Sequence, residues 1–430
     1  MNIEKIYKLY TEFPDVVTDS RKIKKNSIFF GLKGEKFNGN EFADEALKKG
    51  AAYAVIDDEK FVRPGKTILV ENVLKTLQSL AHVHRKKLGI PVLAVTGSNG
   101  KTTTKELIAA VLSKKFNVSF TRENYNNHIG LPLTLLRMTG ETTMGIVEMG
   151  ANHPGEIFSL CSIADPDYGI ITNIGRAHLE GFGSFEKVIK AKGELYDYLK
   201  NKKGIIFYNQ DNPILSRLIG NYAKKVGYGQ NGKNFSCEPV YKSPFINARI
   251  HFPDKLLLYI STNLTGSYNF ENIIAAVSVG HFFGVETEQI RHAIQNYSPK
   301  NNRSQLIKKE GLKIVMDAYN ANPTSMKASI QSFVSDFSNP RCLILGDMLE
   351  LGPYSEREHN EIIEETSKHL FKEVFLIGQE FTKAAKNYPY KTFKNTDSFC
   401  RYIQQNPPGN CSILIKGSRA LQLEKIVGLL

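Results

Sequence analysis

The sequence lacks the features that place a protein in a membrane or direct it out of the cell. No stretch approaches the roughly 20 apolar residues that a membrane-spanning helix needs. The first residues, MNIEKIYKLY, lack the apolar core of a secretory signal. The five cysteines are scattered and none forms a CxxC pair, a pattern typical of reduced thiols. These absences predict a soluble, cytoplasmic protein with no membrane span.

Acidic residues are outnumbered, but the basic residues do not cluster. The 56 Lys and Arg residues against 43 Asp and Glu residues give a formal net charge of +13. Such an excess suits polyanionic partners, yet the sequence contains no arginine-rich tail and no long basic run. We therefore expect an anionic, nucleotide-linked substrate and no nucleic acid. Internal repeats are also missing, and 430 residues predict two or three domains.

The most informative stretch covers residues 92–106 and reads VLAVTGSNGKTTTKE. An apolar run predicts a strand, the glycines predict a tight loop, and the apolar residues at helical spacing after Lys101 predict a helix. Glycines let a backbone approach a phosphate closely, and the free N–H groups of a helix start donate to it. Lys101 would reach the β- and γ-phosphates of ATP, and the hydroxyl of Thr102 would ligate Mg²⁺.

This loop departs from the common phosphate-loop pattern, because Val95 stands where a further glycine is usual. An ordinary glycine-rich turn is therefore the alternative. We favour the phosphate loop, since a lysine and a threonine both lie where phosphate and metal need them. The predicted ATP-binding residues of this segment are Gly97, Ser98, Asn99, Gly100, Lys101, Thr102 and Thr103.

Two further apolar strands are followed by polar residues. The predicted strand at 144–150 carries Glu148 near its end, and the strand at 168–174 leads to His178. The carboxyl ends of parallel strands form one sheet edge, where ligands of α/β proteins bind. Glu148 could hold the nucleotide's Mg²⁺ directly or through water, and His178 could serve a metal or a phosphate. The alternatives are a solvent-exposed glutamate and a structural histidine.

Asparagines precede two apolar helical segments. Asn126 and Asn127 are interpreted as substrate-facing side chains, since buried unpaired amides are costly; the alternative is a polar loop with Asn127 as a helix cap. Asn269 and Asn272 lie three residues apart on one helix face and could bond an adenine edge. The alternative there is capping of the helix by Ser267.

The overall pattern predicts an α/β protein of three domains. Residues 1–87 would form a small α/β domain, residues 88–298 a central mononucleotide-binding parallel sheet around the phosphate loop, and residues 299–430 a Rossmann-like domain of parallel strands. Alternating apolar residues over 245–262, around Pro253 and Asp254, predict an antiparallel hairpin beside the central sheet.

The outer domains add candidate binding residues for which the local sequence gives weaker support. Ser20 and Arg21, with Lys33 opposite, could hold a diphosphate or a uracil edge; taken alone, a capped turn and a solvated loop explain them better. Arg303 lies in a polar linker that faces the central domain. Chemistry alone would assign Lys192 to the surface. A phosphate loop, a metal carboxylate and Arg303 together imply phosphoryl transfer or ATP-driven ligation.

A series of motifs, in order over nearly the full chain, resembles the Mur ligase family of cytoplasmic peptidoglycan synthesis. They are TGSNGKT (96–102), NNHIGLP (126–132), EMGA (148–151), NIGxAH (173–178), AKGE (191–194), DAYNANP (317–323), GDMLELG (346–352) and KGSR (416–419). The last three resemble members that add D-alanyl-D-alanine to UDP-N-acetylmuramoyl-tripeptide. The resemblance implies that ATP phosphorylates the terminal carboxylate of this substrate and that the dipeptide's amine attacks the resulting acyl phosphate.

The resemblance also implies roles for individual residues. Lys101 and Thr102 would hold phosphate and a first Mg²⁺, whose site Glu148 completes. His178 and Lys192 would serve a second Mg²⁺, and the family's equivalent of Lys192 is a carbamate formed with CO₂. In the same way, Asn269 and Asn272 resemble adenine contacts, Arg303 the arginine that steadies the transferred phosphate, Asp317 the ribose contact, and Ser20 and Arg21 the UDP-binding turn.

Some features stay open. Asn38-Gly39-Asn40 departs from the family's frequent Asp-Gly-His loop, which leaves the uridine contacts undefined. Folylpolyglutamate synthetase shares the phosphate loop and the lysine, but it leaves the N-terminal domain unexplained. A catalytically inactive nucleotide-binding module would be expected to lack Lys101, Glu148 or Lys192. We expect a monomer, and the third peptide residue of the substrate is either diaminopimelate or lysine.

Overall fold

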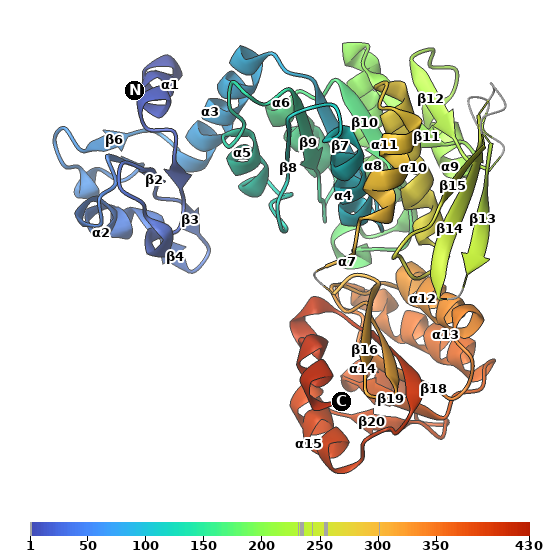
Figure 1. Ribbon diagram of the computed structural model, residues 1–430. Helices are drawn as coiled ribbons and strands as arrows, with labels where there is room; N and C mark the ends of the chain where they lie inside the picture. Colours follow the sequence, from blue (N-terminus) through green and yellow to red (C-terminus); the bar gives the residue numbers. More distant parts are fainter. Residues whose placement is uncertain (1, 231, 233–235, 243, 253–256, 301) are drawn as a thin grey trace.

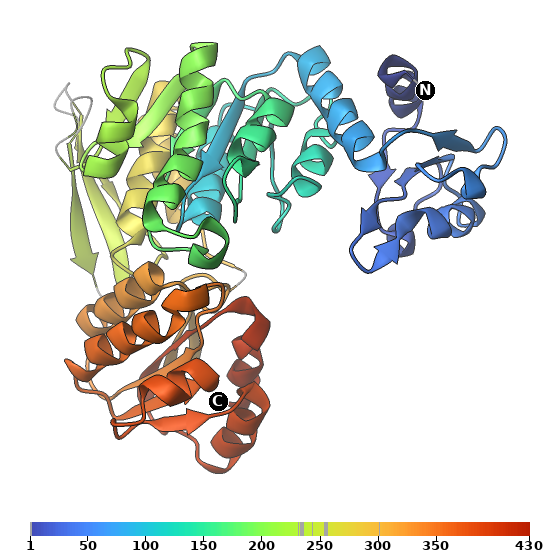
Figure 2. The same cartoon turned by 180° about the vertical axis from the view of Figure 1, so that it is seen from behind.

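The computed structural model describes residues 2–230, 232, 236–242, 244–252, 257–300 and 302–430. The chain forms three lobes, each built around a β-sheet (Figure 1). The first and third lobes attach to different sides of the central lobe, so that the molecule has the outline of an L (Figure 2). The predicted α/β class is confirmed. Among the described helices, none has the length and apolar content that crossing a membrane requires.

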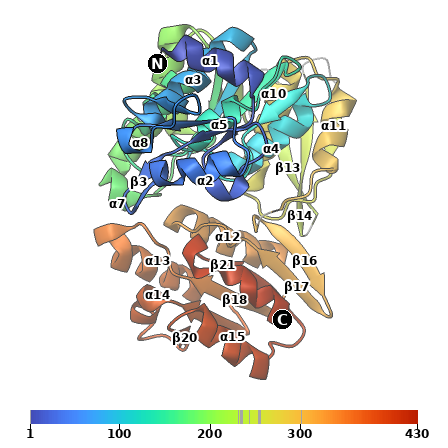
Figure 3. The same cartoon turned by 90° about the vertical axis from the view of Figure 1, so that its left-hand side faces the viewer.

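The first lobe holds a short parallel sheet of order β1-β2-β5-β6 and a small antiparallel hairpin, β3-β4. Its strands are β1 (Val16–Val17), β2 (Ile28–Phe30), β3 (Lys33–Gly34), β4 (Phe37–Asn38), β5 (Tyr53–Ile56) and β6 (Thr67–Leu69), and its helices are α1 (Ile3–Glu12) and α2 (Ala43–Lys48). In the side view this lobe lies in front of the central lobe and above the third (Figure 3).

One long helix, α3 (Val73–Leu88), ties the first lobe to the central one. The side chain of Asn72 caps its start by accepting from the Lys75 N–H, and Gly89 ends it in the left-handed conformation. Arg85, buried on this helix, donates to the carbonyl of Ala164 at 3.0 Å and to the Asp167 carboxylate at 2.6 Å. Helix α3 is therefore fixed to the central lobe by buried polar contacts as well as by apolar packing.

The central sheet is fully parallel and has the order β12-β11-β10-β7-β9-β8. Its strands are β7 (Val92–Thr96), β8 (Val118–Phe120), β9 (Met144–Glu148), β10 (Tyr168–Ile171), β11 (Ile205–Asn209) and β12 (Lys225–Tyr228). The chain passes from β7 towards β8 on one side and later returns to place β10 on the other side of β7. The end of β7 is thus the point where the strand order reverses, which is where open α/β sheets bind ligands.

Helices cover both faces of this sheet, and β7 is buried on both. Leu93 and Val95 pack in one core with α4, α10 and α11, whereas Val92 and Ala94 pack in the other with α3, α5, α6 and α8. A strand buried on two faces needs an uninterrupted apolar run, as the sequence has here. The helices of this lobe are α4 (Lys101–Leu112), α5 (Gly130–Leu135), α6 (Glu156–Ala164), α7 (Leu179–Phe182), α8 (Phe185–Lys202), α9 (Pro213–Ile219), α10 (Asn269–Phe282) and α11 (Thr287–Gln295).

A three-stranded antiparallel sheet lies beside the central one. The predicted hairpin corresponds to β14 (Phe245–His251) and β15 (Leu257–Ile260), which pair in antiparallel register. Pro253 and Asp254, the predicted turn, lie outside the described residues. A third strand, β13 (Ser236–Lys242), pairs with β14 and was not predicted.

The third lobe has a six-stranded sheet of order β16-β17-β21-β18-β19-β20. The other strand pairs of this sheet are parallel, as predicted, but the edge strand β16 was not predicted and runs antiparallel to β17. Glu310 and Gly311 join these two strands, and both have positive φ (+23° and +79°), which suits a two-residue hairpin turn. The elements are β16 (Gln305–Lys309), β17 (Leu312–Met316), β18 (Arg341–Gly346), β19 (Glu373–Ile377), β20 (Lys391–Phe393), β21 (Cys411–Lys416), α12 (Pro323–Asp336), α13 (Ser355–Ser367), α14 (Gln379–Ala384) and α15 (Thr396–Gln405).

Candidate active site

A cleft of about 1240 Å³ opens where the carboxyl ends of β7, β9 and β10 face the third lobe. Most residues predicted from the sequence line it: Ser98, Asn99, Gly100, Lys101, Thr102, Thr103, Asn126, Asn127, Glu148, His178, Asn269, Asn272, Arg303 and Asp317. The other predicted residues lie outside this lining: Gly97, Lys192, Ser20, Arg21 and Lys33. The cleft thus joins residues of the central and third lobes.

The phosphate loop depends on two glycines for its shape. Gly97 and Gly100 have φ of +140° and +76°, conformations that glycine adopts without strain. A Cβ at Gly97 would lie 2.1 Å from the Thr172 hydroxyl, and one at Gly100 would lie 2.5 Å from Oδ1 of Asn272. Gly100 has no side chain to cap α4, so the first N–H groups of the helix are left for a ligand.

Residues 172–175, directly after the end of β10, form hydrogen bonds with the phosphate loop. The Ser98 hydroxyl donates to the Gly175 carbonyl at 3.0 Å and accepts from the Gly175 N–H at 2.9 Å. The Asn99 N–H donates to Oδ1 of Asn173 at 3.0 Å, and the Thr172 hydroxyl donates to the Asn99 carbonyl at 2.6 Å. The loop is therefore preorganised by neighbouring protein groups.

Lys101 curls back over its own loop. Its Nζ donates to the carbonyls of Gly97 at 2.7 Å and Ser98 at 3.0 Å. Burial lowers the pKa of Lys101 to about 8; the Glu148 carboxylate opposes this shift and the Arg303 charge adds to it. The amine therefore lies directly over the backbone of the loop that is predicted to bind phosphate.

Glu148 is held at the start of α4 and is only 2% exposed, so its interpretation as a solvent-exposed glutamate is wrong. Its Oε2 accepts from the Thr102 hydroxyl at 2.9 Å, and its Oε1 accepts from the Asn126 amide at 2.9 Å. Burial raises the pKa of Glu148, but the charges of Lys105, Lys101 and Arg303 outweigh that effect, and the net pKa is lowered. A hydroxyl and an ionised carboxylate in contact fit a Mg²⁺ site that nucleotide phosphates complete.

Lys105 is a buried charge to which the sequence had given no role. Its Nζ lies 3.4 Å from Oε2 of Glu148, and its side chain is 1% exposed. Within the described part of the chain the Lys105 amine makes no hydrogen bond. Its spacing of four from Lys101, which places both on one helix face, is the signal that could have identified it.

His178 contacts a residue of the third lobe. Its Nδ1 forms a hydrogen bond with Oε2 of Glu350, and this contact lowers the pKa of the Glu350 carboxyl. Glu350 belongs to the GDMLELG motif, but its pairing with His178 was not predicted. In the described ranges, no group of three or more His, Cys, Asp and Glu side chains is arranged to hold a metal ion.

Lys192 lies behind the cleft, and its assignment to the surface is wrong. The side chain is 1% exposed; its Nζ donates to the Ala151 carbonyl at 3.1 Å and lies 5.4 Å from the Phe182 ring centroid. Burial lowers the pKa of Lys192 to about 7, and the positive charge of Lys101 acts in the same direction. A substantial fraction of this amine is thus neutral near pH 7, and a neutral amine can add CO₂.

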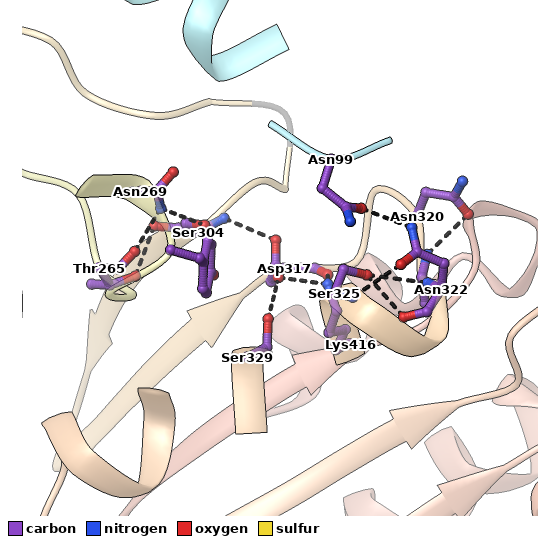
Figure 4. Close-up of polar contacts among 12 residues, drawn as sticks. Asn99, Thr265, Asn269, Ser304, Asp317, Asn320, Asn322, Ser325, Ser329 and Lys416 are labelled. Atoms are coloured by element: carbon purple, nitrogen blue, oxygen red, sulfur yellow. Dashed lines mark hydrogen bonds and ion pairs between the residues drawn. The ribbon is translucent and has the colours of Figure 1, made fainter. Parts of the chain in front are cut away.

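Asn269 and Asn272 are buried and bonded to protein groups. Asn272 accepts from the Thr104 hydroxyl at 2.9 Å and donates to Oδ1 of Asn269 at 2.8 Å. Asn269 donates to the Thr265 carbonyl at 2.7 Å (Figure 4). Helix α10 begins after Tyr268 without a side-chain cap, so capping by Ser267 is wrong. The two amides tie α10 to the phosphate-loop helix at the cleft wall.

Asn127 lies at the cleft, and its interpretation as the N-cap of the following helix is wrong, because the N-cap of α5 is Ile129 and no side chain caps that helix. It lines the cleft, and its Oδ1 accepts from the N–H groups of Ile129 at 3.1 Å and Gly130 at 2.9 Å, at the start of α5. These two bonds order the turn before α5 and do not remove Asn127 from the cleft surface, because its amide retains its Nδ2 donors.

The third lobe meets the phosphate loop directly (Figure 4). The Asn322 amide donates to Oδ1 of Asn99 at 2.7 Å. Asp317 accepts from the Ser329 hydroxyl at 2.8 Å and from Nζ of Lys416 at 2.6 Å. These contacts hold the asparagine and the carboxylate in place before any nucleotide arrives.

Arg303 reaches the cleft from the segment before β16. Its guanidinium lies 3.5 Å from the ring centroid of Tyr319, a cation–π contact. The Arg303 Nε is buried and finds no hydrogen-bond partner among the described residues. The arginine is thus oriented by the tyrosine and retains a donor for a ligand. Tyr319 was not predicted, although it lies in the DAYNANP motif.

The predicted first-lobe residues lie apart from the cleft. Asp19 caps the short helix Ser20–Lys22, and its carboxylate pairs with Arg21 at 2.8 Å. The Arg21 side chain is 85% exposed. Lys33 pairs with Asp57 at 2.9 Å and is 49% exposed. The capped turn considered from the sequence is present, and both basic side chains are open to solvent.

Comparison with known proteins covers nearly the whole chain. The model described as Mur ligase family, catalytic domain, matches residues 14–107, that of the Mur ligase middle domain matches 95–280, and that of the Mur ligase, glutamate ligase domain, matches 302–419. UDP-N-acetylmuramoyl-tripeptide–D-alanyl-D-alanine ligase of Bacillus subtilis (strain 168) is 37% identical over 427 residues, which cover 96% of this chain and 92% of the relative.

Solved structures give the same result. A crystal structure of MurF from Acinetobacter baumannii matches with a TM-score of 0.88 and 28% identity, covering 96% of this chain and 92% of the other. The MurF ligase of Thermotoga maritima in complex with ADP matches with a TM-score of 0.85 and 28% identity, covering 96% of both chains.

Proposed function

Because the chain belongs to the Mur ligase family, we propose that it uses ATP to join D-alanyl-D-alanine to UDP-N-acetylmuramoyl-tripeptide, forming the pentapeptide precursor of cytoplasmic peptidoglycan synthesis. The observation that carries this proposal is the shared cleft, in which the phosphate loop, Glu148 and Arg303 face one another. The Bacillus subtilis relative named for this reaction matches the chain through all three lobes.

The chemistry requires activation of a carboxylate. A carboxylate does not react with an amine near neutral pH, because its poor leaving group is an oxide. ATP supplies a phosphoryl group that bonds to a carboxylate oxygen, and ADP leaves. The dipeptide's amine then attacks the carbonyl carbon of this acyl phosphate, the C–O bond to phosphate breaks, and the products are an amide, phosphate and a proton.

The chain's own groups bind and orient the phosphates. The free N–H groups at the start of α4 and the Lys101 amine hold the β- and γ-phosphates. To do so, the Lys101 amine exchanges its bonds with the Gly97 and Ser98 carbonyls for bonds with phosphate oxygens. Arg303, held over Tyr319, stabilises the charge of the transferred phosphoryl group from the opposite side of the cleft.

Magnesium would occupy two places. Thr102 and Glu148 would hold the first ion, and His178 with the carbamate of Lys192 the second. When bound, the ions neutralise the negative charge that develops on the phosphate oxygens. The buried Lys192 amine fits the carbamate role, because its lowered pKa leaves it free to react with CO₂. That reaction releases one proton and converts the neutral amine into an anionic oxygen ligand.

The remaining assignments follow the family. We place adenine near Asn269 and Asn272 and the ribose near Asp317, whose present protein partners hold these side chains at the cleft wall. Asn126 and Asn127 would contact the substrate beside the phosphate loop. The UDP moiety would bind the first lobe through Ser20, Arg21 and Lys33, and the enzyme would act as a monomer.

The test is phosphate release from ATP with UDP-N-acetylmuramoyl-tripeptide and D-alanyl-D-alanine. Parallel reactions with the diaminopimelate and the lysine tripeptide also identify the third peptide residue. We expect phosphate release that depends on the dipeptide with one of the two. Release that needs a folate and glutamate instead would favour the synthetase alternative, and no release with any acceptor would favour an inactive nucleotide-binding module.

A further inference from the structure

The contact between His178 and Glu350 joins two unusual backbone positions from different lobes. His178 lies before α7 with φ of +54°, and Glu350 lies after β18 with φ of +62°. Residues other than glycine adopt such conformations rarely, and they persist where the surrounding structure imposes them. The two side chains nevertheless meet in a hydrogen bond between Nδ1 of His178 and Oε2 of Glu350.

The loop that carries Glu350 is fixed within the third lobe. The Met348 N–H donates to Nε2 of His359 at 3.0 Å, and the Leu349 N–H donates to the Ser418 hydroxyl at 2.9 Å. One residue earlier, the Asp347 carboxylate accepts from the Phe381 N–H at 2.8 Å. Three consecutive residues before Glu350 are thus anchored, so the carboxylate is presented from a rigid support.

The same segment docks on the turn that carries His178. The Glu180 N–H donates to the Glu350 carbonyl at 3.1 Å, and the Tyr354 hydroxyl donates to the Gly183 carbonyl at 3.0 Å. At Gly352, with φ of +52°, a Cβ would lie 3.2 Å from Cβ of Glu180. The lobes therefore remain in contact here through groups other than the Glu350 carboxylate.

We propose that Glu350 is a positioning residue for His178. With the carboxylate accepting at Nδ1, the ring is fixed in the tautomer whose Nε2 lone pair is available to a metal ion. His178 and Glu350 both line the cleft, so the third lobe contributes to the site by setting the state of a central-lobe ligand. This inference rests on the proposed function for the role of His178 towards magnesium.

A merely structural tie between lobes would be an alternative role for the same contact. Tyr354→Phe is a matched control, because it removes one inter-lobe hydrogen bond, that to Gly183, and leaves the carboxylate of Glu350 in place. Glu350→Ala removes the acceptor at Nδ1, and Glu350→Gln keeps an acceptor without the charge. Positioning predicts effects that depend on this acceptor, whereas a tie predicts similar effects of Glu350→Ala and Tyr354→Phe.

The first measurement is nitrogen NMR of the imidazole rings at mildly alkaline pH, with the His178 signals identified by their loss in His178→Gln. We expect the Nδ1–H tautomer in the wild type and in Tyr354→Phe, and a mixture of tautomers in Glu350→Ala. Melting curves of all variants verify that they fold. This readout needs no substrate, so it decides the inference even if the wild type shows no dipeptide-dependent phosphate release, a result that would contradict the proposed function alone.

The second measurement is the Mg²⁺ concentration that gives half-maximal phosphate release. Partners of metal-ligating histidines affect metal affinity or activity by about 10- to 100-fold, so we expect a rise of that size for Glu350→Ala, a smaller one for Glu350→Gln and no change for Tyr354→Phe. A wild-type tautomer and magnesium requirement in Glu350→Ala, or an equal shift in Tyr354→Phe, would overturn the inference.

Discussion

The two regions assigned to anionic substrates are built in opposite ways. At the edge of the central sheet, Glu148 is 2% exposed and Lys192 is 1% exposed, and each is bonded to a group from another element. In the first lobe, the Arg21 side chain is 85% exposed and Lys33 is 49% exposed, each paired with one carboxylate. Preorganised charges in a dry site act most strongly on a transition state, whereas exposed ones contribute to binding. Substitutions in the two regions should therefore separate kcat from KM.

The largest effect is expected at the phosphate loop. Lys101→Ala removes the amine that lies over the cradle, and loss of a preorganised donor of this kind costs about 10²- to 10³-fold in kcat. The measurement is dipeptide-dependent phosphate release at saturating substrates. Lys114→Ala, an exposed lysine just beyond the same helix, is the control and should match the wild type. A kcat for Lys101→Ala within a few-fold of the wild-type value would contradict the expectation that buried charges of the central site determine kcat.

The next effect concerns Lys192. Lys192→Ala should lower turnover by about 100-fold, which is the size of effect seen when groups that support a metal site are removed. Short carboxylic acids such as acetate should restore part of this turnover by occupying the place of the carbamate. Lys190→Ala, an exposed lysine on the same helix, serves as the control. Failure of the acids to rescue a folded Lys192→Ala protein would argue against the carbamate, and wild-type turnover would argue against any role at the metal.

The parts of this site that could be predicted from the sequence are those that follow from local patterns of strands, glycines and helices. The order of strand, loop and helix around Lys101 follows from local periodicity and glycine spacing, and it places Glu148 and His178 at the same sheet edge through the parallel-strand rule. These residues do line one cleft. Their roles towards phosphate, metal and substrate remain predictions until measured.

What escaped prediction depends on distant packing. Glu350 lies 172 residues from its partner His178, and nothing in either local pattern specifies the pairing. Lys192 and Lys105 have ordinary helical neighbours, and their burial arises only when α8 and α4 pack on the sheet. The antiparallel strand β16 and the two-residue turn after it follow the predicted linker around Arg303, and no strand was predicted there.

A smaller effect is expected in the first lobe. Arg21→Ala should raise KM for the UDP-linked substrate by about tenfold, the value of one charge-assisted hydrogen bond, with kcat unchanged because the residue lies outside the cleft lining. Steady-state kinetics at varied tripeptide concentration measures both constants. Lys22→Ala, its exposed neighbour, controls for general loss of positive charge. A fall in kcat without a change in KM would place Arg21 in the chemistry and break the comparison.

The smallest effect tests how the two regions are joined. Asp165 pairs with Lys86 of α3 at 2.8 Å and with Lys202 at 2.7 Å. Burial raises the pKa of Asp165, but its bonds with Lys202, Lys86 and Tyr198 outweigh burial and hold the pKa well below its usual range. A carboxyl whose pKa is lowered on folding stabilises the protein above its unfolded pKa of about 3.9, and this stabilisation is lost as pH falls through the folded value.

Asp165→Asn should accordingly lower the melting temperature at neutral pH by a few degrees, as expected for roughly 1 kcal/mol, and the deficit should shrink as the pH falls below about 4. Thermal melts of wild type and variant at both pH values measure this difference. Asp15→Asn, which breaks an exposed pair with Lys24, should have little effect at either pH. An equal deficit for Asp165→Asn at both pH values would show that its charge is not the source.

The most direct measurement follows an oxygen atom. The tripeptide substrate is prepared with oxygen-18 in its terminal carboxylate, and the phosphate released during pentapeptide formation is examined by mass spectrometry. If ATP activates the carboxylate in this cleft, the carboxyl oxygen that bonded to phosphorus leaves with the phosphate, and each phosphate carries one labelled oxygen. Pentapeptide formed together with unlabelled phosphate would contradict the account.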